Sequence, residues 1–146
     1  STVNVRNKIT FAKKWSYPGV VGNEFCIGGL EKSNYKDNIS HDYMCRLRKE
    51  KIKRVSNFIG STYLFGKFCG DLLVVTWGGS YGVVKSCVED LQHKGYSVSF
   101  LVLKYLNPFP QDLEDIFLNF KKIVVVESNL GQLYYLLRCN YYFNIF

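Results

Sequence analysis

The amino-acid sequence predicts an α/β fold with three layers (α/β/α), in which helices cover both faces of a mostly parallel β-sheet. Three observations support this prediction. From residue 70 onward, strand-like apolar runs alternate three times with helix-like segments, which is the pattern of parallel sheets. The chain has 146 residues, close to the usual size of one domain. Its hydrophobic content of 47% is enough to form a core.

Residues 1–59 are predicted to form an irregular N-terminal extension that ends in a basic helix. The first forty residues combine aromatics and glycines with little periodicity. Ser40 is expected to cap a helix that starts at His41, because its hydroxyl can accept a hydrogen bond from the first turn. Apolar side chains then recur at helical spacing, and one lysine interrupts them. They are Met44, Leu47, Lys51, Val55, Phe58 and Ile59.

Residues 60–146 are predicted to form the α/β domain itself. Its first strand covers residues 71–76, and a helix follows over residues 80–94. One face of this helix is apolar. That face consists of Val83, Val84, Cys87, Val88 and Leu91. We therefore expect the Cys87 thiol to be buried, and we expect Gly95 to end the helix in the left-handed conformation.

The second half of this domain repeats the pattern. A second strand is predicted over residues 98–103 and a third over residues 123–127. The third strand is continuously apolar, as strands covered on both faces are. Helices are predicted over residues 111–120 and 131–139. The tail, residues 140–146, is apolar but short, so it can add a strand or dock on a partner.

A functional edge is predicted at the carboxyl ends of the strands, where open α/β sheets bind ligands and partners. Each predicted strand is followed there by a distinctive loop. The candidate residues are Trp77, Gly78, Gly79, Ser80, Tyr81 and Gly82 in the first loop, Asn107, Pro108, Phe109 and Pro110 in the second, and Glu127, Asn129, Gly131 and Gln132 in the third. Because parallel strands point the same way, we expect these loops to form one surface for a subunit or a ligand.

The first loop joins a strand to a helix through glycines, as phosphate-binding loops do. Its glycines stand at positions 78, 79 and 82, so the loop matches neither the GxGxxG nor the GxxxxGK[ST] pattern. A free helix N-terminus can still bind an anion. The pattern nevertheless favours a tight turn or an interface loop.

Glu127 is the candidate acid of this edge. A carboxylate at the end of a buried strand can act as a general base, or it can accept hydrogen bonds from nearby backbone N–H groups. The two histidines, His41 and His93, both lie near predicted helix ends. Their spacing indicates no Ser–His–Asp or Cys–His arrangement. We therefore predict no catalytic residue in this chain.

The net charge of +7 is concentrated in one cluster of the sequence. Its members are Arg46, Arg48, Lys49, Lys51, Lys53 and Arg54. Such a cluster can meet nucleic acid or an acidic protein, or it can be the solvated face of a helix. No nucleic-acid recognition motif accompanies it, so nucleic acid is the partner that the sequence favours least.

The cysteine pattern and the chain start set further expectations. The five cysteines form no CxxC or Cys/His motif, so we expect no metal ion or iron–sulfur cluster in this chain. Reduced thiols favour the cytoplasm. No run approaches the roughly 18 apolar residues of a membrane helix, so no membrane association is expected. A chain that starts at Ser1 without a basic and apolar leader is expected to lack a signal peptide and to be processed or part of a longer chain.

The loops also carry a resemblance to a known family. The stretch VVTWGGSYGVVKSCVEDLQHKG, the turn LNPFP and the element ESNLGQL resemble the carboxyl-terminal region of the α subunit of 2-oxoacid:ferredoxin oxidoreductases, the 2-oxoglutarate type in particular. Earlier residues resemble that subunit too. They are Gly22, Glu24, Phe25, Gly29, Leu30 and Glu31, and then His41, Arg48 and Lys51 in the basic helix. The chain departs from the family pattern at Asn23 and at Lys32-Ser33.

The resemblance implies a fold and a role that the residues alone do not. Enzymes of this family decarboxylate a 2-oxoacid on thiamine diphosphate, transfer the acyl group to coenzyme A and pass electrons through iron–sulfur chemistry to ferredoxin. The resemblance implies a transketolase carboxyl-terminal-like domain that assembles with a thiamine-binding β subunit. It also implies that thiamine diphosphate, Mg and the iron–sulfur cluster belong to the whole complex and not to this chain alone.

Two functions therefore remain open at this point. The first is a non-catalytic assembly domain of a cytoplasmic oxidoreductase that uses 2-oxoglutarate. The second is a stand-alone module that binds a phosphorylated ligand of the coenzyme A type, and a bulky residue in place of Gly79 would remove that binding. In either case the basic cluster can attract an acidic protein, and in the first case that protein would be ferredoxin.

Overall fold

The computed structural model describes residues 7–12, 19 and 38–146. The chain divides into two compact units, residues 1–58 and 59–146. The early residues that carry the family resemblance, from Gly22 to Glu31, lie outside the described residues, and so does Cys26.

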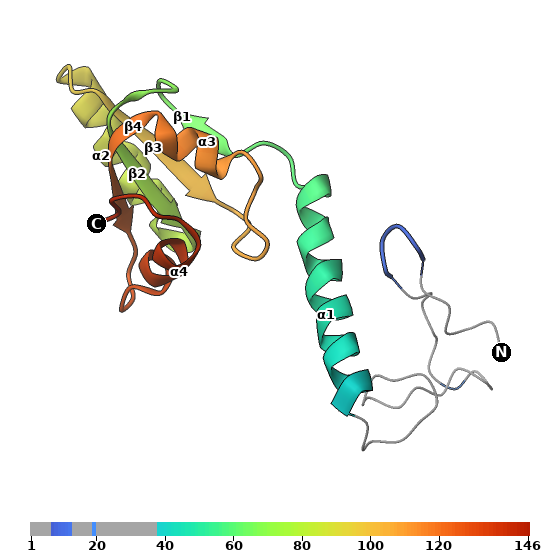
Figure 1. Ribbon diagram of the computed structural model, residues 1–146. Coiled ribbons are helices and arrows are strands. Elements are labelled where there is room, and N and C mark those ends of the chain that lie inside the picture. The colour runs from blue at the N-terminus through green and yellow to red at the C-terminus, as the bar shows by residue number, and fades with distance from the viewer. Residues whose placement is uncertain (1–6, 13–18, 20–37) are drawn as a thin grey trace. The chain divides into compact units, whose positions relative to one another are not determined.

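Helix α1 (Asn38–Arg54) and the short 3₁₀ helix η2 (Val55–Phe58) dominate the described part of the first unit (Figure 1). The prediction that Ser40 caps this helix is wrong, because the helix begins two residues earlier and Ser40 lies inside it. Of the residues at helical spacing, Met44 is buried, whereas Phe58 is 76% exposed. The 3₁₀ helix η2 has three residues per turn and an α-helix has about 3.6. The Phe58 side chain is therefore rotated away from the face that continues the α1 pattern.

The second unit contains a four-stranded sheet in the order β1-β3-β2-β4. Strand β2 (Gly70–Trp77) pairs in parallel with β3 (Val98–Leu103) and with β4 (Phe120–Val126). These three strands confirm the predicted parallel sheet, but β4 begins at Phe120, the residue predicted to end the preceding helix, and it ends one residue before Glu127. Strand β1 (Tyr63–Phe65) adds an antiparallel edge beside β3. Its three residues are too few for a periodic pattern in the sequence.

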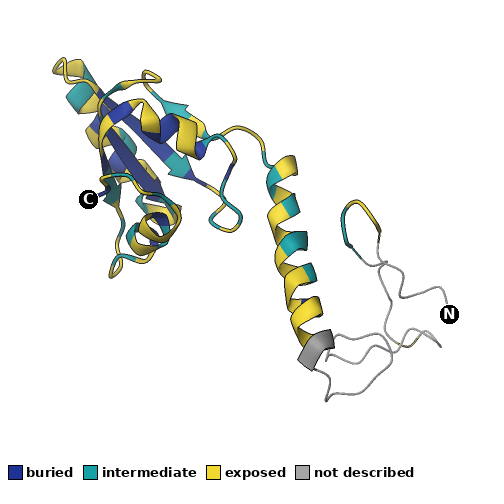
Figure 2. Ribbon diagram, in the orientation of Figure 1, coloured by how far each residue is buried: buried dark blue, intermediate teal, exposed yellow. Residues whose placement is uncertain are grey.

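Helices cover both faces of this sheet, which confirms the predicted three layers (Figure 1). On one face, Val84 and Val88 of helix α2 (Tyr81–His93) pack in a cluster with Phe100 of β3. On the other face, residues of α3 (Leu113–Leu118) and α4 (Gln132–Asn140) pack against the same central strands. Figure 2 accordingly shows the central strands as the buried layer of this unit.

The prediction that the Cys87 thiol is buried on α2 is wrong. Cys87 is exposed and not buried. The face of α2 that packs on the sheet is narrower than the apolar pattern suggests, since Val84 and Val88 are buried while Val83 is 73% exposed. Cys87 follows Val83 by four residues, so both side chains share the outward face of the helix.

One backbone conformation and one long-range contact fix the ends of elements around the sheet. Gly95 has a φ of 87°, which confirms the left-handed residue predicted after α2. Asp112, just before α3, accepts hydrogen bonds from the backbone N–H of Thr62 at 2.7 Å and from the Thr62 hydroxyl. This contact ties the entrance of β1 to the start of α3, although the two are 50 residues apart.

The tail returns to the outer edge of β4. Ile145 forms a parallel bridge with Ile123. The Val125 N–H donates a hydrogen bond to the Phe146 backbone oxygen at 2.8 Å, and the Phe146 N–H donates to the Ile123 oxygen at 3.0 Å. The Ile145 side chain is only 3% exposed. Of the two predicted alternatives, the tail therefore adds strand-like pairing, and it covers an edge that would otherwise offer free N–H and C=O groups. Among the described residues, no helix is both long enough and apolar enough to span a membrane.

Replacing Ile145 by alanine is expected to lower the free energy of unfolding by about 2–5 kcal/mol, because it removes buried methyl groups and leaves a cavity. Urea denaturation followed by circular dichroism measures the change. Tyr142→Ala is the matched control, since the Tyr142 side chain is fully exposed and its loss should change stability by less than about 0.5 kcal/mol. Equal stability of the two variants would contradict the docking of the tail.

Candidate functional site

The strand register brings the three candidate loops to one edge of the sheet. Trp77 at the end of β2 stands opposite Leu103 at the end of β3, and Thr76 stands opposite Val126 at the end of β4. The buried Thr76 hydroxyl also donates a hydrogen bond to the backbone oxygen of Val126 at 2.6 Å. The loops that follow these strands therefore leave the sheet side by side. That they serve as an interface stays a prediction.

The carboxylate of Glu127 joins the first loop to the third. Its Oε2 accepts a hydrogen bond from the Trp77 indole Nε1–H at 3.3 Å and another from the backbone N–H of Leu133 at 2.9 Å. Its Oε1 accepts from the backbone N–H of Tyr134 at 3.0 Å. These two backbone groups belong to the first turn of α4, where N–H groups lack partners within the helix. Glu127 is thus a capping residue of α4.

The hydrogen bonds also set the charge state of Glu127. Burial by itself raises the pKa of this carboxyl group. The backbone N–H groups of Tyr134 and Leu133, together with the side chains of Asn129 and Trp77, favour the charged form and hold the pKa below its usual value of 4.5. A carboxylate that is ionised and saturated with donors is a poor general base, because its lone pairs are already engaged.

The rest of the third loop completes the cap of α4. The Asn129 side-chain oxygen accepts hydrogen bonds from the backbone N–H groups of Gly131 and Gln132, both at 2.9 Å. Gly131 has a φ of 93°, and a Cβ there would lie 3.3 Å from the Tyr135 ring. The ESNLGQL element therefore builds the start of α4. It also leaves Leu130 at the tip of the loop with 97% of its surface exposed.

The first loop is a short 3₁₀ turn, η3 (Gly78–Ser80), that leads into α2. Ser80 makes no side-chain capping hydrogen bond to the helix. Gly79 and Gly82 lack the positive φ that favours glycine, and a Cβ at either would meet no heavy atom within 4 Å. The chain's own packing does not require glycine at these two positions. Glycine leaves the surface bare there, so another molecule could approach the backbone closely.

The second loop is anchored to the core more than the other two. The Phe109 ring lies 5.7 Å from the Tyr141 ring, centroid to centroid, and Pro110 is buried. The Asn107–Pro108 peptide bond is cis, and Asn107 is exposed. Phe109 and Pro110 therefore act mainly as packing residues that hold Asn107 at the surface.

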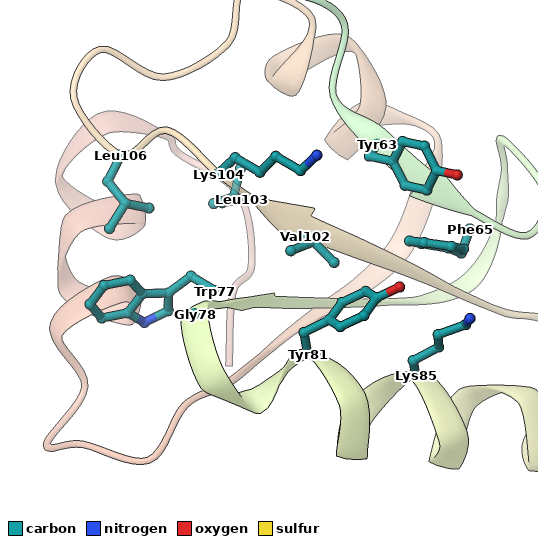
Figure 3. A pocket seen from close by; sticks show the side chains of 10 residues that line it. All are labelled: Tyr63, Phe65, Trp77, Gly78, Tyr81, Lys85, Val102, Leu103, Lys104 and Leu106. Atoms are coloured by element: carbon teal, nitrogen blue, oxygen red, sulfur yellow. The ribbon is translucent and has the colours of Figure 1, made fainter.

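An open groove of about 980 Å³ lies next to the first two loops (Figure 3). Trp77, Gly78 and Leu106 line one end of it. Sequence reasoning missed the groove, because its other walls come from elements that carried no motif. These walls include Tyr63 and Phe65 from β1, Lys85 from α2 and Lys104 after β3. The only available signals were the i, i+4 spacing of Tyr81 and Lys85 and the position of Lys104 at a strand end.

The described residues offer no group of three or more His, Cys, Asp or Glu side chains that could hold a metal ion. The described cysteines are all free and exposed, and they are distributed over separate elements. They are Cys45, Cys69, Cys87 and Cys139. This donor set does not fit an iron–sulfur cluster or a metal ion.

Comparison with known proteins identifies relatives among the 2-oxoacid oxidoreductases. The family model of the pyruvate:ferredoxin oxidoreductase core domain II matches residues 70–142. The 2-oxoglutarate oxidoreductase subunit KorA of Mycobacterium tuberculosis is 36% identical over 148 aligned positions, which cover 93% of this chain and 21% of that protein. The 2-oxoglutarate synthase subunit KorA of Methanocaldococcus jannaschii is 42% identical over 65 positions, which cover 44% of this chain and 18% of that protein.

A solved structure of the same kind of enzyme is similar to nearly the whole chain. The 2-oxoglutarate:ferredoxin oxidoreductase from Magnetococcus marinus, with 2-oxoglutarate, coenzyme A and succinyl-CoA bound, superposes with a TM-score of 0.78 and 26% identity. The match covers 96% of this chain and 26% of that one. The chain therefore spans about a fifth to a quarter of the length of these relatives.

Replacing Glu127 by glutamine is expected to lower the free energy of unfolding by about 1–3 kcal/mol at pH 7, because charge-assisted hydrogen bonds to α4 and Trp77 are weakened. The folded-state pKa is lowered, so the stabilisation is fully present above about pH 4.5 and is lost as the pH falls through the lower folded value. Urea denaturation at several pH values measures this.

The difference between the wild-type chain and the Glu127→Gln variant should shrink towards zero in acid. Glu89→Gln is the control, since Glu89 forms an exposed pair with Lys85 at 3.7 Å and its loss should cost less than about 1 kcal/mol. A Glu127→Gln effect that is the same at pH 7 and in acid would show that the carboxylate charge does not stabilise α4.

Proposed function

Because the chain belongs to the pyruvate:ferredoxin oxidoreductase core domain II family, we propose that it is a non-catalytic assembly domain in the α subunit of a 2-oxoacid:ferredoxin oxidoreductase. The observation that carries this proposal is the state of Glu127. The one candidate acid of the carboxyl edge accepts hydrogen bonds from three donors, two of them backbone N–H groups of α4. Glu127 therefore supports the structure of the edge and is not free to act as a general base.

The surface around Glu127 has the features of a protein interface. Leu130 projects from the third loop with 97% exposure, and Gly79 and Gly82 leave the backbone of the first loop bare. Exposed apolar side chains that gather on one edge typically mark a contact with another protein. We therefore assign the candidate loops to contact with the partner subunit.

The whole complex is proposed to decarboxylate 2-oxoglutarate oxidatively. Carbon dioxide leaves, coenzyme A takes the resulting acyl group, and two electrons pass to ferredoxin. Thiamine diphosphate, Mg and the iron–sulfur cluster are proposed to lie in other parts of the complex, as the family resemblance implies. The partner is proposed to be the thiamine-binding β subunit, and the location to be the cytoplasm.

The test is to tag the full-length native protein that contains this chain and to capture it anaerobically with its partners. We expect a thiamine-binding subunit to co-purify, together with coenzyme A-dependent reduction of a viologen dye by 2-oxoglutarate. A protein that is captured alone and inactive would overturn the proposal. If that isolated protein bound coenzyme A, the stand-alone ligand-binding module would be supported instead.

A bulky side chain in the first loop tests the role of the edge directly. Gly79→Trp should leave the fold intact, because a Cβ at Gly79 meets open space, but it should reduce the recovery of the partner subunit. His93→Trp is the matched control, since His93 is exposed at the other end of α2. Equal recovery of the partner with both variants would argue against an interface at this loop.

Ferredoxin is proposed to meet the basic helix α1. Two of its cations are already paired within the helix, Arg46 with Asp42 at 2.7 Å and Arg54 with Glu50 at 3.2 Å. The Arg54 guanidinium also stacks 3.7 Å above the Phe11 ring. Lys49 is exposed, and among the described residues no carboxylate forms an ion pair with it. It is therefore the better residue for testing a long-range attraction.

Lys49→Glu should slow the reduction of ferredoxin by the captured complex severalfold at low ionic strength, and added salt should remove the difference. Reduction of a neutral dye is the control and should be unchanged. The same ferredoxin rate for the variant and the wild-type complex at low salt would exclude α1 as the docking surface.

A further inference from the structure

The groove beside the first two loops carries an inference that rests on the proposed assembly role. We propose that this groove is the docking site for an acidic segment of the partner subunit. Its walls lie within a single unit of the chain, between strand β1 on one side and the start of α2 on the other (Figure 3). Its charge, its exposed aromatic rings and its openness to solvent favour such a segment.

The groove is lined by two cations, and one of them has no carboxylate partner among the described residues. Two lysines, Lys85 and Lys104, are among its ten lining residues, and no aspartate or glutamate is among them. Lys85 shares its charge with Glu89, 3.7 Å away on the same helix. Lys104 has no ion pair among the described residues, and its Nζ lies 5.8 Å from the centre of the Tyr63 ring. A carboxylate that enters the groove would find a cation without a carboxylate partner.

The walls between these cations are aromatic. The Tyr63 and Phe65 rings meet edge to face with centroids 4.5 Å apart, and Phe65 lies 6.1 Å from Tyr81. Tyr63 is 58% exposed and Tyr81 is 38% exposed. Tyrosine rings that are partly exposed beside cations are typical of protein interfaces, where an apolar face and a polar tip can both be used. The occupant should therefore carry apolar side chains next to its acids.

The shape of the groove favours a polypeptide over a small molecule. Sites for small ligands bury most of the ligand surface, whereas this groove is open to solvent. It ends at Trp77 and Gly78, next to the bare backbone of Gly79. It is thus continuous with the edge that is proposed to meet the partner subunit, and one polypeptide can contact both surfaces.

Zero-length cross-linking of the captured complex tests the contact. A carbodiimide joins an amine to a carboxylate only where the two touch, so Lys104 should become linked to an aspartate or glutamate of the partner subunit. Lys104 is the reporter, because Lys85 can react with its own neighbour Glu89. Lys94 is the control, since it is exposed beyond the far end of α2 and should form no such link.

A pair of charge reversals tests the energetic contribution. The double variant Lys85→Glu/Lys104→Glu should raise the Kd between the two subunits at least about tenfold, because it places like charges against the acidic segment. The control double variant Lys67→Glu/Lys94→Glu changes the net charge equally but lies in exposed positions away from the groove. Lys104→Gln alone should weaken binding less, and an unchanged melting temperature should show that each variant is folded.

The possible outcomes lead to different conclusions. Cross-links from Lys104 and a raised Kd for the groove variant alone would support the proposal. Normal assembly, with an unchanged Kd and no link from Lys104, would overturn it and leave the assembly role standing. If Lys104 in the complex resists acetylation without being linked, and becomes reactive after small molecules are removed, a small anion occupies the groove and the proposal is wrong. If no partner is captured, both the proposed function and this inference fail.

Discussion

The carboxylate of Glu127 accepts hydrogen bonds from groups in two separate loops, and the arrangement of the carboxyl edge depends on it. Its oxygens bind two backbone N–H groups at the start of α4 and the indole of Trp77 at the end of β2. Strand β4, helix α4 and the glycine-rich loop are thereby fixed to one another. An ionised carboxylate suits this position, because it can accept several hydrogen bonds at once. The positive end of the helix dipole also stabilises its negative charge.

The edge built around this residue has a fixed part and an open part. In the fixed part, Asn129 and Gly131 complete the cap of α4, and Phe109 packs on Tyr141. In the open part, the glycines of the first loop face empty space and Lys104 has no carboxylate partner among the described residues. A rigid frame that presents an open surface is consistent with the proposed assembly role, since little conformational entropy is lost when a preformed surface binds.

The sequence indicated much of this edge but not its chemical roles. Trp77, Asn107 and Glu127 follow three strands of recognisable pattern, so their gathering at one edge could be predicted from the parallel topology. The choice between a base and a capping acid at Glu127 could not, because it depends on which donors the folded chain brings within 3 Å. The groove was missed for a similar reason. Tyr63 reaches Lys104 only through the antiparallel pairing of β1 with β3, and no periodic pattern marks a strand of three residues.

By itself, the sequence determined the α/β class, the three parallel strands, the helices between them and the left-handed Gly95, because these features follow from local periodicity and backbone preference. Only the tertiary structure decided the exposure of Cys87, the place of the tail beside β4 and the partners of Glu127. Each of these depends on contacts between residues that are distant in the sequence or on the rotation of a helix against the sheet. Neither a helical pattern nor a motif specifies such contacts, since many of them satisfy the same local preferences and only the packing of the whole unit selects one.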